Sequence, residues 1–414
     1  MLETLFKKQD SIELLQNNPL VSHLESFAKS LAEDAYAVST VQSKLLWIVQ
    51  LGWWLQDEKI AIALLDERII DTFLKELRRQ GRLRRGQGPT TLRFLVHLRN
   101  QGIIPCPDPV CDKSPMAELE RQYDKYLRIE RGLTTATVVN YRPVVHRFLV
   151  HQYGDGPLHL EELMASDIAT YVLDHAHSQS AKRAQLMVTA LRSFFRFLLR
   201  DAKIQVDLAA CVPTVANWRL SSVPKYIAEE DIQRLLDACD RSTSTGRRDY
   251  AILLLLARLG LRAGEIVALE MDDIDWRAGD MMVRGKGSFH DRLPLLTEPG
   301  EALAAYLCTD RPRTRTRRVF VRMQAPHTGF AGPSTVSTIV RRALERAGLH
   351  SPTKGAHLLR HSLATTMLQQ GASMAEIGEV LRHRSPNTTE IYAKVDLLGL
   401  RSLAQPWPNI GGAR

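Results

Sequence analysis

Two proline-rich segments without hydrophobic periodicity interrupt this chain, and they constrain its fold more than any other feature. The first, IIPCPDPVCDKSP at 103–115, carries four prolines, and the second, DLAACVPTVANWRLSSVPKY, covers residues 207–226. Proline disfavours helix at its own position and at the preceding residue, so such segments are typical of linkers. At 414 residues the chain is also too long for one ordinary core. We therefore expect three blocks, at about 1–104, 116–203 and 225–400, and a tail at 401–414.

The first two blocks carry apolar residues at helical spacing. Residues 116–131 place four large apolar side chains on one helical face, namely Leu119, Tyr123, Tyr126 and Leu127. The same kind of periodicity predicts further helices at 39–55, 66–79, 137–152 and 180–200. Both blocks are therefore expected to be helical.

The third block changes from a helical pattern to strands and back. Helices are expected at 227–240, 247–260, 263–270, 334–347 and 356–370. Between them lie three β-prone runs, at 272–276, 281–285 and 292–296. Glycine-containing turns join these runs, which is typical of hairpins. The pattern predicts a mainly α fold, with a small antiparallel β-sheet in this C-terminal block and helical N-terminal domains.

The chain is basic, with a formal net charge of +9 and a pI near 9.4. Excess cation favours a polyanionic partner such as DNA, through phosphate contacts and counterion release. Arginines gather at 78–85 and at 311–318. Either cluster can equally be a solvated loop, and many basic proteins bind nothing acidic. Charge alone therefore leaves the partner open.

Five cysteines, at 106, 111, 211, 239 and 308, argue against a disulfide framework and for a reducing compartment. Cys106 and Cys111 could be half of a zinc site, but no second ligand pair lies at a matching spacing, so we expect linker residues. The longest apolar run, 251–257, is too short to cross a bilayer. The N-terminus lacks the order of a secretion signal. We expect a cytoplasmic protein that does not associate with a membrane. We also expect it to need no metal ion and no nucleotide cofactor.

The motif HLLRH at 357–361 is the first candidate for chemistry. His357 and Arg360 are three residues apart, so both project from nearly one helix face. A metalloprotease helix would need Glu directly after the first histidine, where Leu358 stands. On its own the pair is most simply an exposed helix face.

Further residues in the same block change this interpretation. Arg262 lies just beyond the helix that ends at Gly260, and Lys286 lies between two glycines of a hairpin turn. Downstream, LRHRS supplies His383, and a helix opened by Ser385 and Pro386 carries Tyr392 nine residues after that histidine. The residues thus form an ordered set of Arg, hairpin Lys, His-x-x-Arg, His and Tyr.

This ordered set resembles the tyrosine recombinase family, the phage-integrase-like site-specific recombinases. The resemblance covers about residues 116–400 and is strongest at 258–296 and 354–395. It implies six catalytic residues: Arg262, Lys286, His357, Arg360, His383 and Tyr392. Glu265 matches an acidic residue that often supports the first arginine. The chain departs from the family at Arg382, where glycine is usual before the second histidine.

The chemistry suits these residue types. Attack of a phenol on a phosphodiester adds negative charge to the non-bridging oxygens, and two planar guanidiniums can stabilise that charge. Tyrosine, with a pKa of about 10, is a poor nucleophile until cations and a base assist it. His357 is the candidate base, His383 a donor to phosphate, and Lys286 the acid for the departing 5′ oxygen. The phosphotyrosine ester keeps the energy of the broken bond, so rejoining needs no ATP.

The resemblance implies a recombinase that cuts and rejoins DNA through a covalent 3′-phosphotyrosine intermediate. Residues 116–203 would be the helical, SAM-like core-binding domain and 225–400 the catalytic domain. Double-stranded DNA would be the partner, with four protomers, or related recombinase subunits, on two DNA sites in the nucleoid. Residues 1–104 would add a DNA-binding or protein-contact module, and the 401–414 tail would dock on its own or a neighbouring subunit. By analogy, the protein would serve a mobile genetic element.

Two other functions are compatible with the sequence. A type IB topoisomerase uses the same cleavage chemistry but relaxes supercoils. A DNA-binding protein that kept the fold and lost activity would carry the same basic charge.

Overall fold

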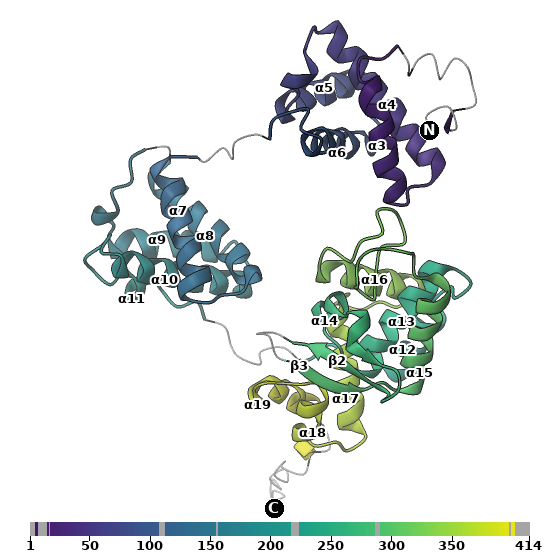
Figure 1. Ribbon diagram of the computed structural model, residues 1–414. Helices are drawn as coiled ribbons and strands as arrows, with labels where there is room; N and C mark the ends of the chain where they lie inside the picture. The colour runs from purple at the N-terminus through teal and green to yellow at the C-terminus, as the bar shows by residue number, and fades with distance from the viewer. Residues whose placement is uncertain are drawn as a thin grey trace, which may run out of the picture. The chain divides into compact units, whose positions relative to one another are not determined.

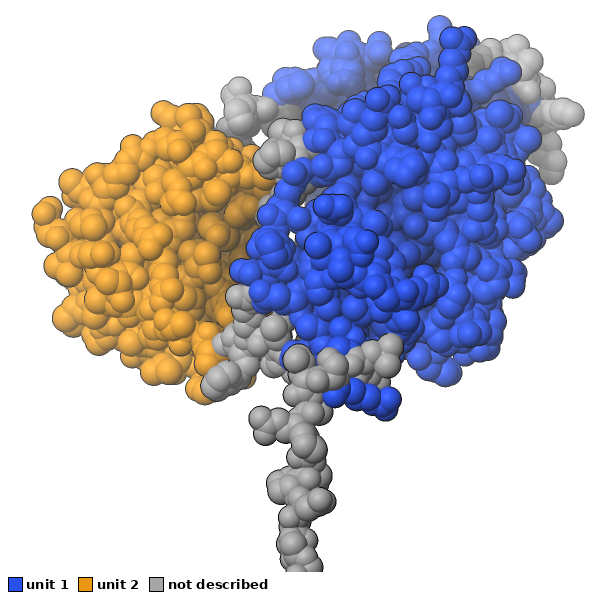
Figure 2. All heavy atoms as spheres, turned by 90° about the horizontal axis from the view of Figure 1, so that it is seen from below, with its two compact units in different colours: residues 1–107, 224–414 blue, residues 108–223 orange. Residues whose placement is uncertain are grey.

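The computed structural model describes residues 5–6, 15, 17–106, 112–154, 156–216, 223–285, 290–396 and 399–401. The chain divides into two compact units, one formed by residues 1–107 with 224–414 and the other by residues 108–223 (Figure 2). Within the described ranges, no helix is long and apolar enough to cross a membrane. The expected fold class, mainly α with a small antiparallel sheet, is confirmed.

The N-terminal block is a group of packed helices (Figure 1). They are α3 (Val21–Glu33), α4 (Val38–Asp57), α5 (Glu67–Arg79) and α6 (Gln87–Asn100), with a 3₁₀ turn at Ile62–Leu64. Asp66 begins α5 as predicted, because its carboxylate accepts the Ile69 N–H at 2.8 Å. Phe27 and Phe94 join α3 to α6 edge to face, with ring centroids 5.0 Å apart.

The second unit is also helical. It contains α7 (Pro115–Lys125), a π-helical turn (Tyr126–Glu130), α8 (Thr135–Tyr153), a 3₁₀ turn (Leu160–Glu162), α9 (Ala165–Ala176), α10 (Ala181–Arg200) and α11 (Leu208–Cys211). Ser114 caps α7, and Pro115 occupies its first turn, where a missing N–H costs nothing. Helix α10 supplies more buried core residues than any other helix of this unit, and its Phe194 packs edge to face on Tyr123 with ring centroids 5.2 Å apart.

The C-terminal part of the chain surrounds one central helix. Its helices are α12 (Glu229–Asp237), α13 (Ser244–Arg258), α14 (Ala263–Ala268), α15 (Thr297–Ala305), α16 (Pro333–Arg346), α17 (Ala356–Gln369), α18 (Met374–Val380) and α19 (Pro386–Thr389). Shorter turns are 3₁₀ at Met271–Asp273, π at Tyr306–Asp310 and 3₁₀ at Glu390–Val395. Helix α13 is central because every residue from 251 to 257 is buried. The apolar run therefore reflects burial on all sides.

A three-stranded antiparallel sheet lies beside these helices (Figure 1). The strands are β1 (Ile274–Asp275), β2 (Asp280–Arg284) and β3 (His290–Pro294), in the order β1-β2-β3. Met281 and Val283 point inward from β2, as the strand period of two requires. The turn from β1 to β2 uses Gly279 at φ +69°, where a side chain would be strained. Residues 286–289, between β2 and β3, lie outside the described residues.

Two expectations from the sequence were wrong in detail, and one helix had not been expected. Residues 207–226 are not a linker throughout, because Asp207 caps α11 and both Leu208 and Val212 are buried in the core of the second unit. Strand β3 begins at His290 rather than at residue 292. Helix α15 was not expected from the sequence, and its proline, Pro299, lies in the first turn, where a helix tolerates it.

Candidate active site

Arg262 is held at the start of α14 by a carboxylate of the same helix. The chain leaves α13 through Gly260, whose φ is +57° and where a Cβ would lie 2.7 Å from Leu381. Arg262 is then the N-cap of α14, and its N–H donates to Glu265 Oε2 at 2.8 Å. Its guanidinium donates to Oε1 of the same carboxylate at 2.7 Å. The contact expected between Glu265 and the first arginine is therefore present.

Arg360 is buried on α17. It is 3% exposed, whereas His357 on the same helix is exposed, so the simple reading of an exposed helix face is wrong for Arg360. Its two terminal nitrogens donate to the carbonyls of Gly260 and Leu381. Burial, and then repulsion from Arg262, lowers the pKa of Arg360 to about 9. The side chain is still a cation at neutral pH.

The two arginines converge at the end of α18. Arg360 donates to the carbonyl of Leu381, and Arg262 donates to the carbonyl of the next residue, Arg382, at 3.2 Å. Consecutive residues are about 3.8 Å apart along the chain, so the guanidiniums lie near each other. Neighbouring cations repel, and an anion bound beside both would remove that repulsion. The arrangement can therefore provide an anion pocket.

Arg382 adds a third guanidinium to this cluster. Its side chain is 8% exposed and pairs with Glu265 at 2.9 Å. Burial alone would raise the pKa of Glu265, but the Arg262 N–H and the two guanidiniums outweigh it, so this pKa lies below its usual value. The carboxylate is therefore charged, and together with three arginines it leaves the cluster with a net positive charge.

Tyr392 lies on the 3₁₀ turn Glu390–Val395 and is 1% exposed. It packs with residues of α17 and α18 in a small apolar cluster. Its hydroxyl is 2.9 Å from Nδ1 of His361. The His383 ring lies parallel to the phenol, with centroids 6.5 Å apart, and its Nδ1 is 2.8 Å from the Thr389 hydroxyl. The structure thus brings Tyr392 and His383 together.

Burial shifts the pKa values of both groups toward the neutral form. It raises the pKa of Tyr392 to about 12, although Arg360 opposes this. It lowers the pKa of His383 to about 4, assisted by Arg360 and Arg262. At neutral pH the site therefore holds a neutral phenol and a neutral imidazole beside cations.

Comparison with known proteins decides the family. Residues 225–397 match the Phage integrase family, and residues 121–202 match the Phage integrase, N-terminal SAM-like domain. The chain is 44% identical over 392 residues to integrase/recombinase y4rA of Sinorhizobium fredii, covering 94% of this chain and 95% of that protein. It is 30% identical to tyrosine recombinase XerD of Listeria monocytogenes, covering 70% of this chain and 97% of XerD. The chain belongs to the tyrosine recombinase family.

Solved structures show the same fold as this recombinase. XerH site-specific recombinase, in a post-cleavage complex with palindromic difH substrate, matches with a TM-score of 0.54 at 18% identity, over 76% of this chain and 94% of XerH. A lambda integrase tetramer bound to a Holliday junction matches with a TM-score of 0.53 at 19% identity, over 80% of this chain and 90% of the integrase.

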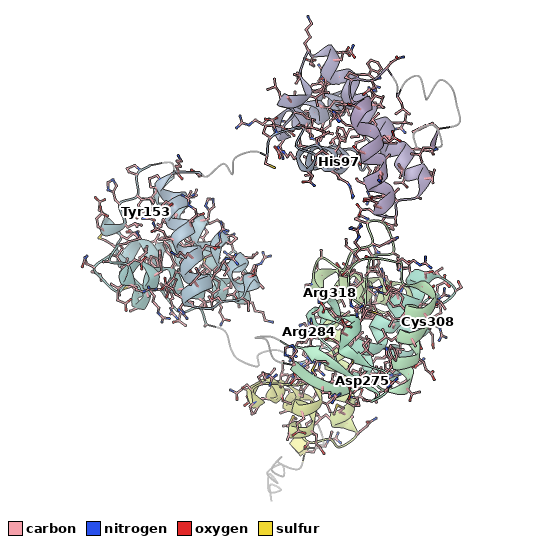
Figure 3. The ribbon with its side chains drawn as sticks, viewed as in Figure 1. His97, Tyr153, Asp275, Arg284, Cys308 and Arg318 are labelled. Atoms are coloured by element: carbon pink, nitrogen blue, oxygen red, sulfur yellow. The ribbon has the colours of Figure 1, made fainter. Side chains whose placement is uncertain are left out.

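The base of the β2–β3 hairpin is fixed by ion pairs. Arg284, the last residue of β2, pairs with Glu270 at 3.1 Å and with Asp273 at 2.8 Å, and Arg318 approaches Glu270 at 3.4 Å. Figure 3 labels Arg284 and Arg318. These contacts hold the strand that leads into the hairpin turn. Lys286 itself lies outside the described residues, so its proposed place in the site remains a prediction.

The arginines at 311–318 are partly internal. Arg311 donates to three backbone carbonyls of its own loop, while Arg317 pairs with Asp272. Arg311 is therefore bound within its own loop, whereas Arg317 forms an ion pair at the exposed surface. In the described part of the chain no group of three or more His, Cys, Asp or Glu side chains could hold a metal, and Cys111 lies outside that part.

Two residues of this recombinase site, His361 and Arg382, were not among the predicted catalytic residues. His361 was quoted within HLLRH but given no role, because its contact with Tyr392 joins residues 31 apart in sequence. Arg382 was seen only as a departure from glycine. Its φ of +54° shows why glycine suits the position, and the ion pair with Glu265 shows what the arginine provides.

Replacing Arg382 with glycine is expected to destabilise the protein by about 2 kcal/mol. Relief of the left-handed backbone contributes about 1 kcal/mol, whereas removing one partner of a buried ion pair costs about 3 kcal/mol. Arg382→Ala keeps the backbone strain and should be less stable than Arg382→Gly by about 1 kcal/mol. Urea unfolding followed by circular dichroism measures both. A glycine variant as stable as the wild type would contradict the structural role of the ion pair.

His383 is expected to remain neutral as the pH falls from 8 to 5. Its pKa of about 4 lies below the ordinary 6.5, so the unfolded chain binds the proton first and stability falls as pH drops below about 6.5. A DNA phosphate should raise this pKa, because an anion favours the imidazolium. Histidine ¹⁵N NMR, assigned with His383→Gln, follows both states. Titration of His383 near pH 6.5 in the free protein would show that the ring is not held as described.

Proposed function

We propose that this chain is a site-specific recombinase that cuts and rejoins duplex DNA through a covalent bond between Tyr392 and a 3′-phosphate. The observation that supports it most is the convergence of Arg262 and Arg360 on two consecutive carbonyls, close to the ring of His383. Tyr392 lies close to these arginines, because Arg360 is near enough to affect its pKa. A phosphate bound there would meet two guanidiniums and have a phenol within reach.

In this proposal the positive cluster stabilises the transition state. The five-coordinate phosphorus carries extra charge on its non-bridging oxygens, and charge-assisted hydrogen bonds from Arg262 and Arg360 offset it. Neutral His383 donates a further N–H to a phosphate oxygen. Lys286 protonates the departing 5′ oxygen, and a later attack by a 5′ hydroxyl reverses the reaction.

The proposed partner is double-stranded DNA, and the proposed assembly is four protomers on two sites. The positive charge of the chain fits a DNA partner. The similar lambda integrase is a tetramer on a Holliday junction, and XerH is bound to its difH substrate. Subunits of a related recombinase could take the place of some copies.

In the proposal each domain of the chain has its own role in recombination. Residues 116–203 bind the core of the DNA site and residues 225–400 carry out cleavage. Residues 1–104 form an additional module for DNA or protein contacts, and the 401–414 tail, outside the described residues, docks on this or a neighbouring subunit. The mobile-element role rests on analogy with integrases.

The test is covalent capture on the DNA that flanks this gene. Plasmids carrying these flanks are incubated with the protein, denatured with detergent and searched for protein-bound ends. In a duplex nicked just 3′ to the mapped position, cleavage releases the short fragment that carries the new 5′ hydroxyl, so rejoining is prevented and the covalent complex accumulates. We expect a detergent-resistant complex on the mapped duplex. DNA binding without any such complex would indicate an inactive DNA-binding protein.

A supercoil assay separates recombination from topoisomerase activity. A recombinase is expected to leave a supercoiled plasmid without the mapped site unchanged. Relaxation of every plasmid at a similar rate would instead indicate a type IB topoisomerase.

A further inference from the structure

The Tyr392 hydroxyl is already in contact with an imidazole that the family resemblance did not include. His361 lies on α17, directly after Arg360, and its Nδ1 is 2.9 Å from the Tyr392 oxygen. The two rings meet edge to face, with centroids 5.7 Å apart. In the tautomer that carries its proton on Nε2, Nδ1 accepts the hydrogen bond from the phenol. The contact therefore has the geometry of a proton transfer.

The other two histidines are placed differently. His383 lies parallel to the phenol ring rather than at its oxygen, and its Nδ1 is engaged with Thr389. His357 lies one turn before His361 on α17, with ring centroids 6.3 Å apart, and its side chain is exposed. His361 thus has a hydrogen bond directly to the oxygen of the nucleophile.

We propose that His361 is the general base that takes the proton of Tyr392 during strand cleavage. The inference rests on the proposed function and gives His361 the role that the resemblance gave to His357. The phenol proton moves to Nδ1, the phenol oxygen bonds to phosphorus, and the bond from phosphorus to the 5′ oxygen breaks. That oxygen leaves with a proton from Lys286. In religation neutral Lys286 takes back the proton of the attacking 5′ hydroxyl, and the imidazolium of His361 returns its proton to the departing phenolate.

A base is needed because this phenol ionises with difficulty. Burial raises the pKa of Tyr392 to about 12, so phenolate is scarce at neutral pH. Arg360 favours the phenolate but does not remove the proton. An imidazole at hydrogen-bond distance supplies an acceptor that works near pH 7.

The test compares three variants in single-turnover cleavage of the nicked target duplex between pH 6 and 10. His361→Asn places an oxygen near the position of Nδ1, so it can keep the hydrogen bond but cannot take the proton. His361→Phe removes both. His357→Asn is the matched control on the same helix. Thermal unfolding identifies any variant that is not folded.

Both His361 variants are expected to cleave about 100-fold more slowly at pH 7. Their rates should then rise about tenfold per pH unit toward pH 10, as hydroxide replaces the missing base, so the deficit shrinks. Any loss of rate in His357→Asn should be the same factor at every pH, so it should not shrink toward pH 10. If His357→Asn shows the pH-dependent deficit instead, or if His361→Asn cleaves like the wild type while His361→Phe does not, the proposal is wrong.

A substrate with a sulfur leaving group distinguishes a defect in protonating the leaving group from a defect in deprotonating the nucleophile. When sulfur replaces the bridging 5′ oxygen, the leaving thiolate needs no proton, so a Lys286→Ala defect should be rescued. The His361→Asn defect should persist, because it concerns the nucleophile. Rescue of His361→Asn by sulfur would overturn the assignment. A wild type that forms no adduct at all would instead refute the proposed function.

Discussion

The variant Tyr392→Phe is expected to form no covalent complex with DNA, a loss of at least about 10⁴-fold in cleavage. Phenylalanine fills the same buried space in the cluster between α17 and α18 but has no oxygen to bond to phosphorus. Losing the hydrogen bond to His361 should cost only about 1 kcal/mol of stability. The variant should therefore stay folded and still bind the nicked duplex. Denaturing gels measure the complex, and gel shifts measure binding.

Tyr306→Phe is the matched control for this prediction. Tyr306 is equally buried in the same part of the chain, and its hydroxyl accepts the Val321 N–H at 3.4 Å, away from the arginine cluster. This variant should cleave DNA like the wild type. If Tyr392→Phe still gave a covalent complex, another residue would be the nucleophile.

The variant Arg360→Lys is expected to reduce cleavage about 10³-fold. The arginine fork is fixed by two carbonyls, those of Gly260 and Leu381, and a single ammonium cannot reproduce that orientation or contact phosphate through two nitrogens. Because the site is buried and close to Arg262, a lysine there would also lose its proton more readily. We expect the loss in the rate constant of adduct formation at saturating protein.

Arg248→Lys controls for the general cost of changing a buried arginine. Arg248 is 8% exposed and bonds to Asp249 and to the Val321 carbonyl. Both variants should lose some stability, measured by thermal unfolding, but Arg248→Lys should cleave at close to the wild-type rate below its melting temperature. Cleavage by Arg360→Lys within tenfold of the wild type would show that Arg360 does not contact the transition state.

The elements around the site could be predicted because their signals are local. Gly260 and Gly371 end helices in left-handed conformation, and Ser373 forms a capping box with Glu376, three residues further on. The order of the candidate residues then pointed to the family. Each of these signals depends on neighbours in sequence.

The contacts that organise the site could not be predicted in this way. Arg360 meets carbonyls 100 and 21 residues away, and the pairing of Arg382 with Glu265 spans 117 residues. Whether a histidine next to Arg360 faces solvent or Tyr392 depends on how α17 packs against the 3₁₀ turn. The register of that packing is a tertiary property, which periodicity does not specify.

The central claim is that Tyr392 is joined to DNA through a 3′-phosphate in a pocket of arginines. The direct measurement is tandem mass spectrometry of the covalent complex after digestion with protease and nuclease. We expect a single modified peptide, with a nucleotide attached to the Tyr392 oxygen through its 3′-phosphate. Attachment at any other residue, or through a 5′-phosphate, would contradict the account.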